Sequence, residues 1–296
     1  MEAGVAASRR SAGRRLAGLF HGRPRLQVGA LLAGPVGWLV VGYLGSLAVL
    51  LVTSFWTLGE LSGEVERSFT LENFRDVVET PVYRDVTVRT VLVAALVTVT
   101  DVVLAFPLAF YMAKVAGPRV KGLLVVAVLM PLWSVYLVKV FAWRGILSQE
   151  GALNWFLDPI GIEGPGYGIV AVWLVMSYIW LPYMIIPIYA GLERIPNTLL
   201  SASEDMGAKP LYTFRRVIMP LVFPAVVAGS IFTFSLTLGD FIAPTLVGSG
   251  EQFIGTVVRD NFTVDLPFAA ALATVPVLIM IVYLLIARRM GAFEHL

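Results

Sequence analysis

The sequence predicts an all-α membrane protein that crosses the bilayer about six times, and three observations carry this prediction. Of the 296 residues, 58% are hydrophobic and only 14% are charged, whereas soluble domains carry roughly 25% charged residues. The apolar residues form six long runs, and most of the basic residues fall on one side of the membrane when these runs are threaded through it. A soluble domain is excluded, because its surface needs more polar residues than this chain has.

Each of the six runs is long enough, or nearly so, to cross the hydrocarbon core, which takes about 20 helical residues. The first run follows a basic segment and is about twice as long as the apolar part of a cleaved signal, which has roughly 7–15 residues. We therefore expect a basic cytoplasmic tail (1–27), one transmembrane domain (28–290) and a short cytoplasmic C-terminal tail (291–296). The predicted spans are residues 28–55, 86–113, 122–142, 168–190, 221–247 and 268–287.

The lysines and arginines indicate that both termini lie in the cytoplasm, because cytoplasmic loops are enriched in these residues. With the N-terminus inside, 15 of the 22 fall inside: six in the tail, three in residues 114–121, four in residues 193–216 and two at 288–289. Seven acidic residues gather in the first external loop, residues 57–85. An even number of spans agrees with this orientation.

The residues needed for most enzyme chemistry are missing. There is no cysteine, and the two histidines, His21 and His295, lie near opposite ends of the chain. Neither a thiolate site nor a cluster of metal ligands can be built from these residues. No G-x-x-x-x-G-K-[ST] motif is present to bind a nucleotide. We expect no enzymatic activity, no cofactor, no metal and no nucleic-acid partner.

The longest predicted cytoplasmic loop, residues 193–220, has the pattern of two short helices joined at Gly207. Asn197 or Thr198 suits the cap of the first helix, and Pro210 suits the first turn of the second. Gly207 stands where a left-handed residue would end the first helix. Apolar residues recur at helical spacing on both helices, which indicates a surface that docks on a partner. We expect Pro220 to open the fifth span.

This loop resembles the EAA motif of the permease subunits of bacterial ABC importers. That motif has Glu-Ala-Ala, a glycine four positions after the second alanine, and an aliphatic residue ten positions later, followed by x-Leu-Pro. The spacing is kept here, with Ser201 in place of the glutamate and Met219 in place of the leucine. The resemblance implies that an ATPase docks on Ser201, Ala202, Ser203, Glu204, Asp205, Gly207, Ala208, Phe214, Val217 and Pro220.

The resemblance extends over most of the chain. Residues 69–74, Thr90 and residues 151–154 resemble this superfamily, while residues 238–248, 253–258 and 267–271 are similar to the first permease subunit of spermidine/putrescine importers. It implies a type I ABC importer fold in a bacterial inner membrane. The implied partners are ABC ATPase subunits, a second permease, an extracytoplasmic solute-binding protein and membrane lipid. It also implies alternating access of a solute path, driven by the ATPase.

Two carboxylates, Asp101 and Asp240, lie within predicted spans, where an ionisable group is costly and points to function. A polyamine is a polycation, so these residues and the aromatic faces of Tyr178, Trp180 and Phe241 are candidates to line its path. Structural roles stay open: an interhelical hydrogen bond for Asp101, packing beside Pro244 for Asp240, and an interfacial belt for the aromatic residues. The many prolines in the spans fit either ordinary kinks or broken helices around a path.

Other functions stay open from the sequence alone. Related permeases carry other small solutes, including aminophosphonates and iron. An ion-coupled secondary transporter would show internal repeats, which the sequence lacks, and it would leave the EAA-like loop unexplained. A membrane-bound sensor or enzyme would need a catalytic constellation.

Overall fold

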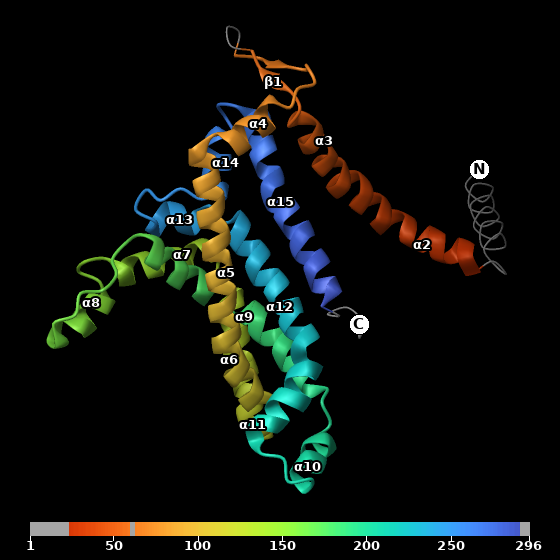
Figure 1. Cartoon of the computed structure of the whole chain (residues 1–296), viewed down its shortest axis with the longest axis vertical. Coiled ribbons are helices and arrows are strands. Elements are labelled where there is room, and N and C mark those ends of the chain that lie inside the picture. Colours follow the sequence, from red (N-terminus) through yellow and green to blue (C-terminus); the bar gives the residue numbers. More distant parts are fainter. Residues whose placement is uncertain (1–23, 60–62, 291–296) are drawn as a thin grey trace, which may run out of the picture. The chain divides into compact units, whose positions relative to one another are not determined.

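The structure is a computed structural model that describes residues 24–59 and 63–290 (Figure 1). Within this part the chain divides into two compact units, with the division between Ser54 and Phe55. The predicted C-terminal tail, and nearly all of the predicted N-terminal tail, lie outside the described residues.

The first unit is a helix that contains the first predicted span. It comprises α2 (Pro24–Trp38), the π-helical segment η1 (Leu39–Leu44) and α3 (Gly45–Thr53). Residues 31–53 carry no charge, and most of their side chains are exposed. Pro35 lies inside α2 and leaves a carbonyl without its helical donor. The π-helical turn follows four residues later, and such turns absorb local irregularity without ending a helix.

The second unit begins with a small extramembrane structure. Strands β1 (Thr57–Leu58) and β2 (Val65–Glu66) pair antiparallel, and α4 (Glu72–Glu79) follows. Phe55 holds this segment together, because its ring centroid lies 6.1 Å from that of Phe69 and 5.1 Å from that of Phe74.

Four helices of the second unit are long and apolar enough to cross a membrane: 81–115, 169–193, 210–239 and 266–289. With the helix of the first unit, the described residues contain five such helices, or six if one bent pair is counted as a span. The prediction of about six spans in an all-α fold is confirmed. Their constituent elements are α5 (Pro81–Phe110), η2 (Tyr111–Val115), α9 (Ile169–Glu193), α11 (Pro210–Thr213), η4 (Phe214–Ile218), α12 (Met219–Gly239) and α15 (Leu266–Arg289).

The third predicted span is not the single helix that we expected. It consists of α6 (Pro118–Trp133) and α7 (Tyr136–Leu147), which meet at an angle of 95°. The break follows Pro131, whose carbonyl accepts hydrogen bonds from the backbone and hydroxyl of Ser134 and, at 3.2 Å, from Lys139 Nζ. These donors satisfy the end of α6 and allow the chain to turn. Two short helical elements continue the chain, α8 (Ala152–Leu157) and η3 (Asp158–Ile160).

The fifth predicted span was misplaced at both ends. Its helix begins at Pro210 and runs through Pro220, so Pro220 does not open the span. It ends at Gly239, where Asp240 turns to an extended conformation. Pro244 explains this end. A proline has no N–H to donate to the carbonyl four residues earlier, here that of Asp240, and its ring clashes with that carbonyl. The chain continues as α13 (Ile242–Val247) and α14 (Ile254–Asn261).

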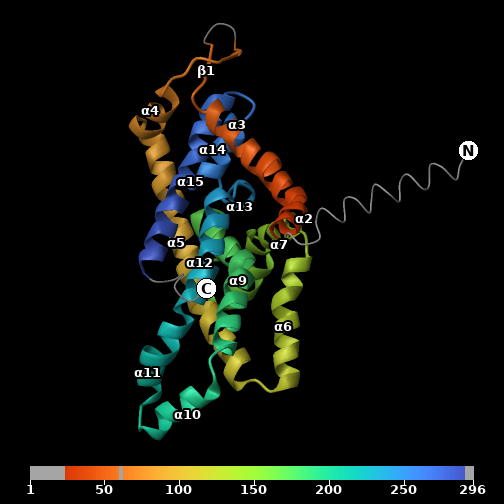
Figure 2. The same cartoon turned by 90° about the vertical axis from the view of Figure 1, so that its right-hand side faces the viewer.

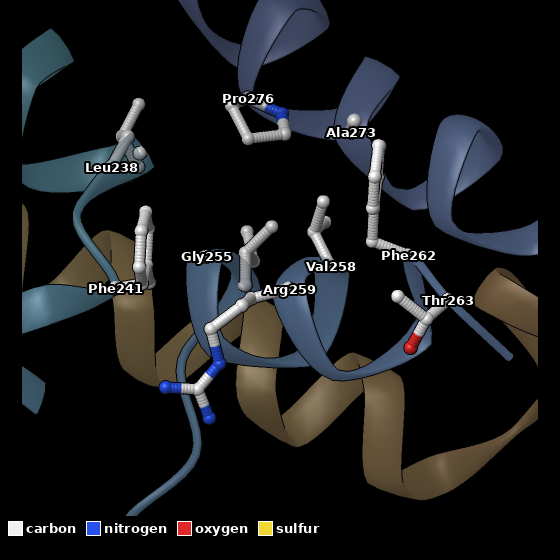
Figure 3. Close-up of a pocket in the computed structure, with 11 residues that line it drawn as sticks. Leu238, Phe241, Gly255, Val258, Arg259, Phe262, Thr263, Ala273 and Pro276 are labelled. Carbon is white, nitrogen blue, oxygen red and sulfur yellow. The ribbon is translucent and has the colours of Figure 1, made fainter. Parts of the chain in front are cut away.

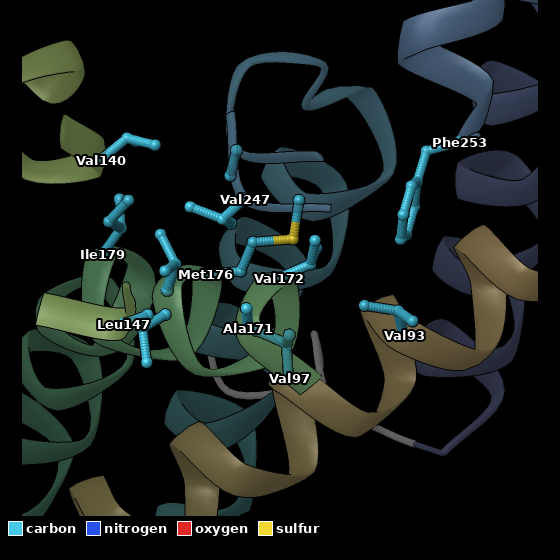
Figure 4. Packing of buried hydrophobic residues seen from close by; sticks show 12 residues of the cluster. Val93, Val97, Val140, Leu147, Ala171, Val172, Met176, Ile179, Val247 and Phe253 are labelled. Atoms are coloured by element: carbon cyan, nitrogen blue, oxygen red, sulfur yellow. The ribbon is translucent and has the colours of Figure 1, made fainter. Parts of the chain in front are cut away.

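Helices α5, α9 and α12 form the centre of the second unit. A buried cluster packs α7 and α13, the helices that follow the two breaks in the chain, against α5 and α9 (Figure 4). It contains Val93 and Val97 of α5, Val172 and Met176 of α9, and Val247 of α13, all at most 5% exposed. The two breaks in the chain are therefore fixed against the core.

The predicted cytoplasmic loop lies at one end of the second unit, far from the β-strands (Figures 1 and 2). It contains α10 (Asn197–Asp205) and the start of the long helix at α11. Pro196, and not Asn197 or Thr198, occupies the cap position of α10. The Asn197 side chain instead accepts a hydrogen bond from Lys114 at 3.2 Å.

Candidate functional site

The turn at Gly207 joins the two helices of the loop in a Schellman motif. Gly207 has φ +74°, as predicted. Its backbone N–H donates to Glu204 O at 2.8 Å, and that of Ala208 donates to Ser203 O at 3.1 Å. A left-handed residue is required here, and glycine adopts this conformation without steric cost.

The side chain of Ser203 fixes α10 against the long helix. It is buried and shares a hydrogen bond of 2.8 Å with Thr213. Among the residues predicted to dock on an ATPase, Ser201, Ala202, Glu204 and Asp205 are exposed. Exposed apolar side chains stand beside them: Leu199, Met206, Leu211 and Tyr212. The loop thus presents a mixed apolar and charged surface that the rest of the described chain does not cover.

Three contacts connect the loop to the spans. Lys114 Nζ, at the end of the second span, donates to Ile195 O at 2.5 Å as well as to Asn197. Lys121 of α6 forms an ion pair with Glu193, the last residue of α9. Phe214 packs edge-on against Phe106 of α5, with ring centroids 5.3 Å apart. A movement of the loop would therefore be transmitted through these contacts to α5, α6 and α9.

A hollow of about 280 Å³ lies where the two chain breaks meet. Three of the residues predicted for the solute path line it, Trp180, Asp240 and Phe241. Tyr136, the first residue of α7, completes the lining of carboxylate and aromatic rings. Tyr136 and Trp180 are stacked, with ring centroids 5.7 Å apart and planes 14° apart. Leu236, Gly239 and Ile242 complete the wall.

Asp240 is held from two sides. One carboxylate oxygen accepts the backbone N–H groups of Ile242 at 2.8 Å and Ala243 at 3.4 Å, at the start of α13. The other accepts the Tyr136 hydroxyl. Asp240 therefore joins the break in the fifth span to the break in the third. Its side chain is largely buried, so a negative charge here would act in a medium that screens it weakly.

Asp101 and Tyr178 do not line this hollow. Asp101 is fully buried on the face of α5 that carries Val97 and Ala105, and its carboxyl oxygens have no hydrogen-bond partner in the described part of the chain. The interhelical hydrogen bond considered for it is absent there. Tyr178 is 39% exposed and packs against Trp143, with ring centroids 5.4 Å apart.

A second hollow of about 510 Å³ is lined by the residues shown in Figure 3. It adjoins the first hollow, because Gly239 and Phe241 line both. Its wall is apolar apart from Arg259 and Thr263. The Arg259 guanidinium lies 5.9 Å from the centroid of the Phe241 ring and donates to Thr245 Oγ1 at 2.7 Å. Phe241 therefore separates a hollow with a carboxylate from a hollow with a cation.

The sequence predicts neither Tyr136 nor Arg259 as a site residue. Tyr136 lies within the third predicted span, and the one signal that points to it is that a buried phenol hydroxyl needs a hydrogen-bond partner. Arg259 lies between the last two predicted spans, where the sequence gives it no role. The place of Tyr136 in the hollow depends on the break at residues 134–135, and that of Phe241, beside Arg259, on the break at residues 240–241.

Comparisons with known proteins agree with this geometry. Residues 87–293 match the family described as binding-protein-dependent transport system inner membrane component. The chain is 41% identical over 299 residues to the inner membrane ABC transporter permease protein YdcU of Escherichia coli, covering 95% of each chain. It is 32% identical to the spermidine/putrescine transport system permease protein PotB of the same organism, covering 85% of this chain and 93% of PotB.

A solved structure shares the fold. A chain of a bacterial ABC transporter involved in the import of the acidic polysaccharide alginate superposes with a TM-score of 0.70 at 16% identity. The match covers 93% of this chain and 98% of the other.

Proposed function

Given that the chain belongs to the family of binding-protein-dependent transport system inner membrane components, and is thus a permease subunit of an ABC importer, we propose that it carries a polyamine. The observation that carries this proposal is the hollow lined by Asp240, Trp180, Tyr136 and Phe241. A carboxylate among aromatic faces is the chemistry that binds an alkylammonium group. The relative named as a spermidine/putrescine permease supports the same solute class.

The charge of Asp240 is the part of this hollow that a single substitution can test. In Asp240→Asn the amide oxygen still accepts from Ile242 and Ala243, and the amide nitrogen donates to the Tyr136 hydroxyl. The negative charge is removed, and the Tyr136 hydroxyl accepts in this hydrogen bond where it donated before. We expect uptake of radiolabelled spermidine by the reconstituted importer to fall at least tenfold, which takes about 1.4 kcal/mol of differential stabilisation.

Asp101→Asn is the matched control, because it removes the other intramembrane carboxylate at a position outside the hollow. Its spermidine uptake is expected to stay within about twofold of the parent, well short of the tenfold loss that corresponds to ~1.4 kcal/mol. Equal uptake by Asp240→Asn and the parent would exclude recognition by charge and leave Asp240 a structural link between the two breaks.

One observation favours a second solute class. The hollow beside Arg259 adjoins the Asp240 hollow, so a zwitterion such as an aminophosphonate could place its ammonium at Asp240 and its phosphonate at Arg259, where it would compete with the ion pair between Arg259 and Asp260. Arg259→Gln separates the two classes. It would abolish uptake of an aminophosphonate and would leave uptake of a polyamine intact.

For coupling, we propose that an ABC ATPase subunit docks on the surface of α10 and α11, and that hydrolysis takes place on that partner. A second permease completes the path, and an extracytoplasmic binding protein delivers the solute. The contacts of Lys114, Glu193 and Phe214 described above support the transmission of loop movement to the spans.

This arrangement requires both termini and residues 193–216 to face the cytoplasm. The chain has no native cysteine, so a single cysteine at Ser68 or Ser201 reports its side without background. Both side chains are exposed. In intact spheroplasts, an impermeant maleimide is expected to label Ser68→Cys and to spare Ser201→Cys until the membrane is opened. Labelling of both variants in intact cells would refute the orientation.

A further inference from the structure

The loop that docks the ATPase contains a hollow of its own, of about 660 Å³. It lies between the end of α10 and the first turns of the long helix. Two basic side chains, Lys209 and Arg216, line it together with Met206, Tyr212 and Val217. Gly207 also lines it, and a Cβ built on this glycine would meet no atom within 4 Å. The hollow is therefore open beside the turn.

The two cations of this hollow, Lys209 and Arg216, have no counter-charge within the described part of the chain. Among the described residues, ion pairs involve Arg75, Arg89, Lys121 and Arg259, and neither Lys209 nor Arg216 takes part in one. Glu204 and Asp205 lie on the same loop and do not pair with them either. A hollow that gathers two unpaired cations is complementary to an anion.

The remaining lining is suited to the stem of a side chain. Met206 is 81% exposed and Tyr212 is 59% exposed, so both offer apolar surface to a partner. Methionine adapts its shape to a partner, and the tyrosine ring covers a large apolar area at low conformational cost. A carboxylate on a short aliphatic stem matches cations set among these groups.

We propose that an aspartate or glutamate side chain of the ATPase subunit enters this hollow and pairs with Lys209 and Arg216. The inference rests on the proposed docking of the ATPase and names the chemistry of the contact. The two sides of the turn would then carry opposite charges to the ATPase. Lys209 and Arg216, after the turn, would meet its acidic residue, and Glu204 and Asp205 of α10, before the turn, would face its basic residues.

Arg215 provides a matched control, because it is exposed, carries the same charge one residue from Arg216 and does not line the hollow. In the purified importer, we expect Lys209→Glu and Arg216→Glu to weaken binding of the ATPase subunit that copurifies with the wild-type permease at least tenfold. Arg215→Glu should change it less than threefold. Lys209→Gln and Arg216→Gln remove the positive charge without reversing it, so each should weaken ATPase binding less than the glutamate variant at the same position does. The two glutamine variants should weaken it by similar factors.

A zero-length carbodiimide cross-link tests the contact itself, since it joins an amine only to a carboxylate that touches it. The wild-type complex is expected to form a permease–ATPase cross-link that contains Lys209 and an acidic residue of the ATPase. Lys209→Arg keeps the charge and binding but should lose this cross-link.

The outcomes separate the possibilities. If the wild-type permease binds no ATPase, the proposed function fails. If it binds and the hollow variants bind equally well, or the cross-link persists in Lys209→Arg, only the present inference fails. If the Lys209 and Arg216 variants bind the ATPase as well as the wild type does, but their transport in vesicles no longer depends on phosphatidylglycerol as that of the wild type does, the hollow holds a lipid headgroup. That result would overturn the inference.

Discussion

Replacing Gly207 by valine is expected to impair transport severely while the permease still inserts in the membrane. The φ of +74° at this position disfavours any residue with a Cβ by roughly 1–2 kcal/mol, and a β-branched residue more. The Schellman hydrogen bonds of Glu204 and Ser203 depend on this conformation. The turn would open, and α10 would lose its place beside Thr213. Uptake is expected to fall at least tenfold, with a parallel loss of copurifying ATPase; tenfold corresponds to about 1.4 kcal/mol.

Gly207→Asn is the control for this prediction, because asparagine tolerates the left-handed conformation better than other side chains. No atom lies within 4 Å of a Cβ built at this position, so the Cβ of neither variant clashes. Near-normal transport by the asparagine variant and loss in the valine variant would assign the effect to the backbone. Equal loss in both would point to side-chain bulk at the docking surface, and normal transport by the valine variant would show that the loop does not couple.

Gly255→Ala is expected to disturb the hollow that contains Asp240, although Gly255 does not line it. A Cβ at Gly255 would lie 2.8 Å from the carbonyl oxygen of Asp240 and 2.9 Å from that of Gly239, and these are backbone atoms that cannot rotate away. Helix α14 would move off the break in the fifth span and disturb Asp240. We expect a loss of roughly 1–3 kcal/mol in stability, as for overpacked sites, and a clear fall in both melting temperature and uptake.

The comparison variant is Gly122→Ala, a helical glycine of α6 with no atom within 4 Å of the added methyl. It should be neutral or slightly stabilising, since alanine favours helix by about 1 kcal/mol over glycine. A melting temperature of Gly255→Ala equal to that of the parent would mean that α14 can retreat without cost, and that the close approach to Asp240 is unimportant.

The spans that the sequence located best are those whose apolar runs are helices without interruption. The second, fourth and sixth fall close to 81–115, 169–193 and 266–289. The third failed because composition is continuous across Ser134 and Val135, while the break depends on how Pro131 O is satisfied by Ser134 and Lys139. Hydropathy contains no information about such donors.

The fifth span could have been bounded more closely from the sequence. The rule that proline obstructs the carbonyl four residues earlier points from Pro244 directly to Asp240. At its other end the sequence correctly predicts a helix that begins at Pro210, but it predicts a separate short helix before a span that opens at Pro220. Arg215 and Arg216 interrupt the apolar run there, whereas the helix continues through them into the span. The grouping of Trp180, Asp240 and Phe241 followed from chemistry, whereas Tyr136 joined them only through the unpredicted break.

The unbroken helix from Pro210 to Gly239 connects the loop of α10 and α11 directly to the hollow that contains Asp240. Its 30 residues extend about 45 Å at 1.5 Å per residue. A tilt of roughly 5° about its Pro210 end would carry Asp240 through about 4 Å, which exceeds the length of a hydrogen bond and would separate its carboxylate from Tyr136. Such a connection works in both directions with equal free energy. Under the proposed function, a tilt driven by the ATPase that changed the affinity of the hollow for solute would require a bound solute to change the affinity of the loop for the ATPase by the same factor.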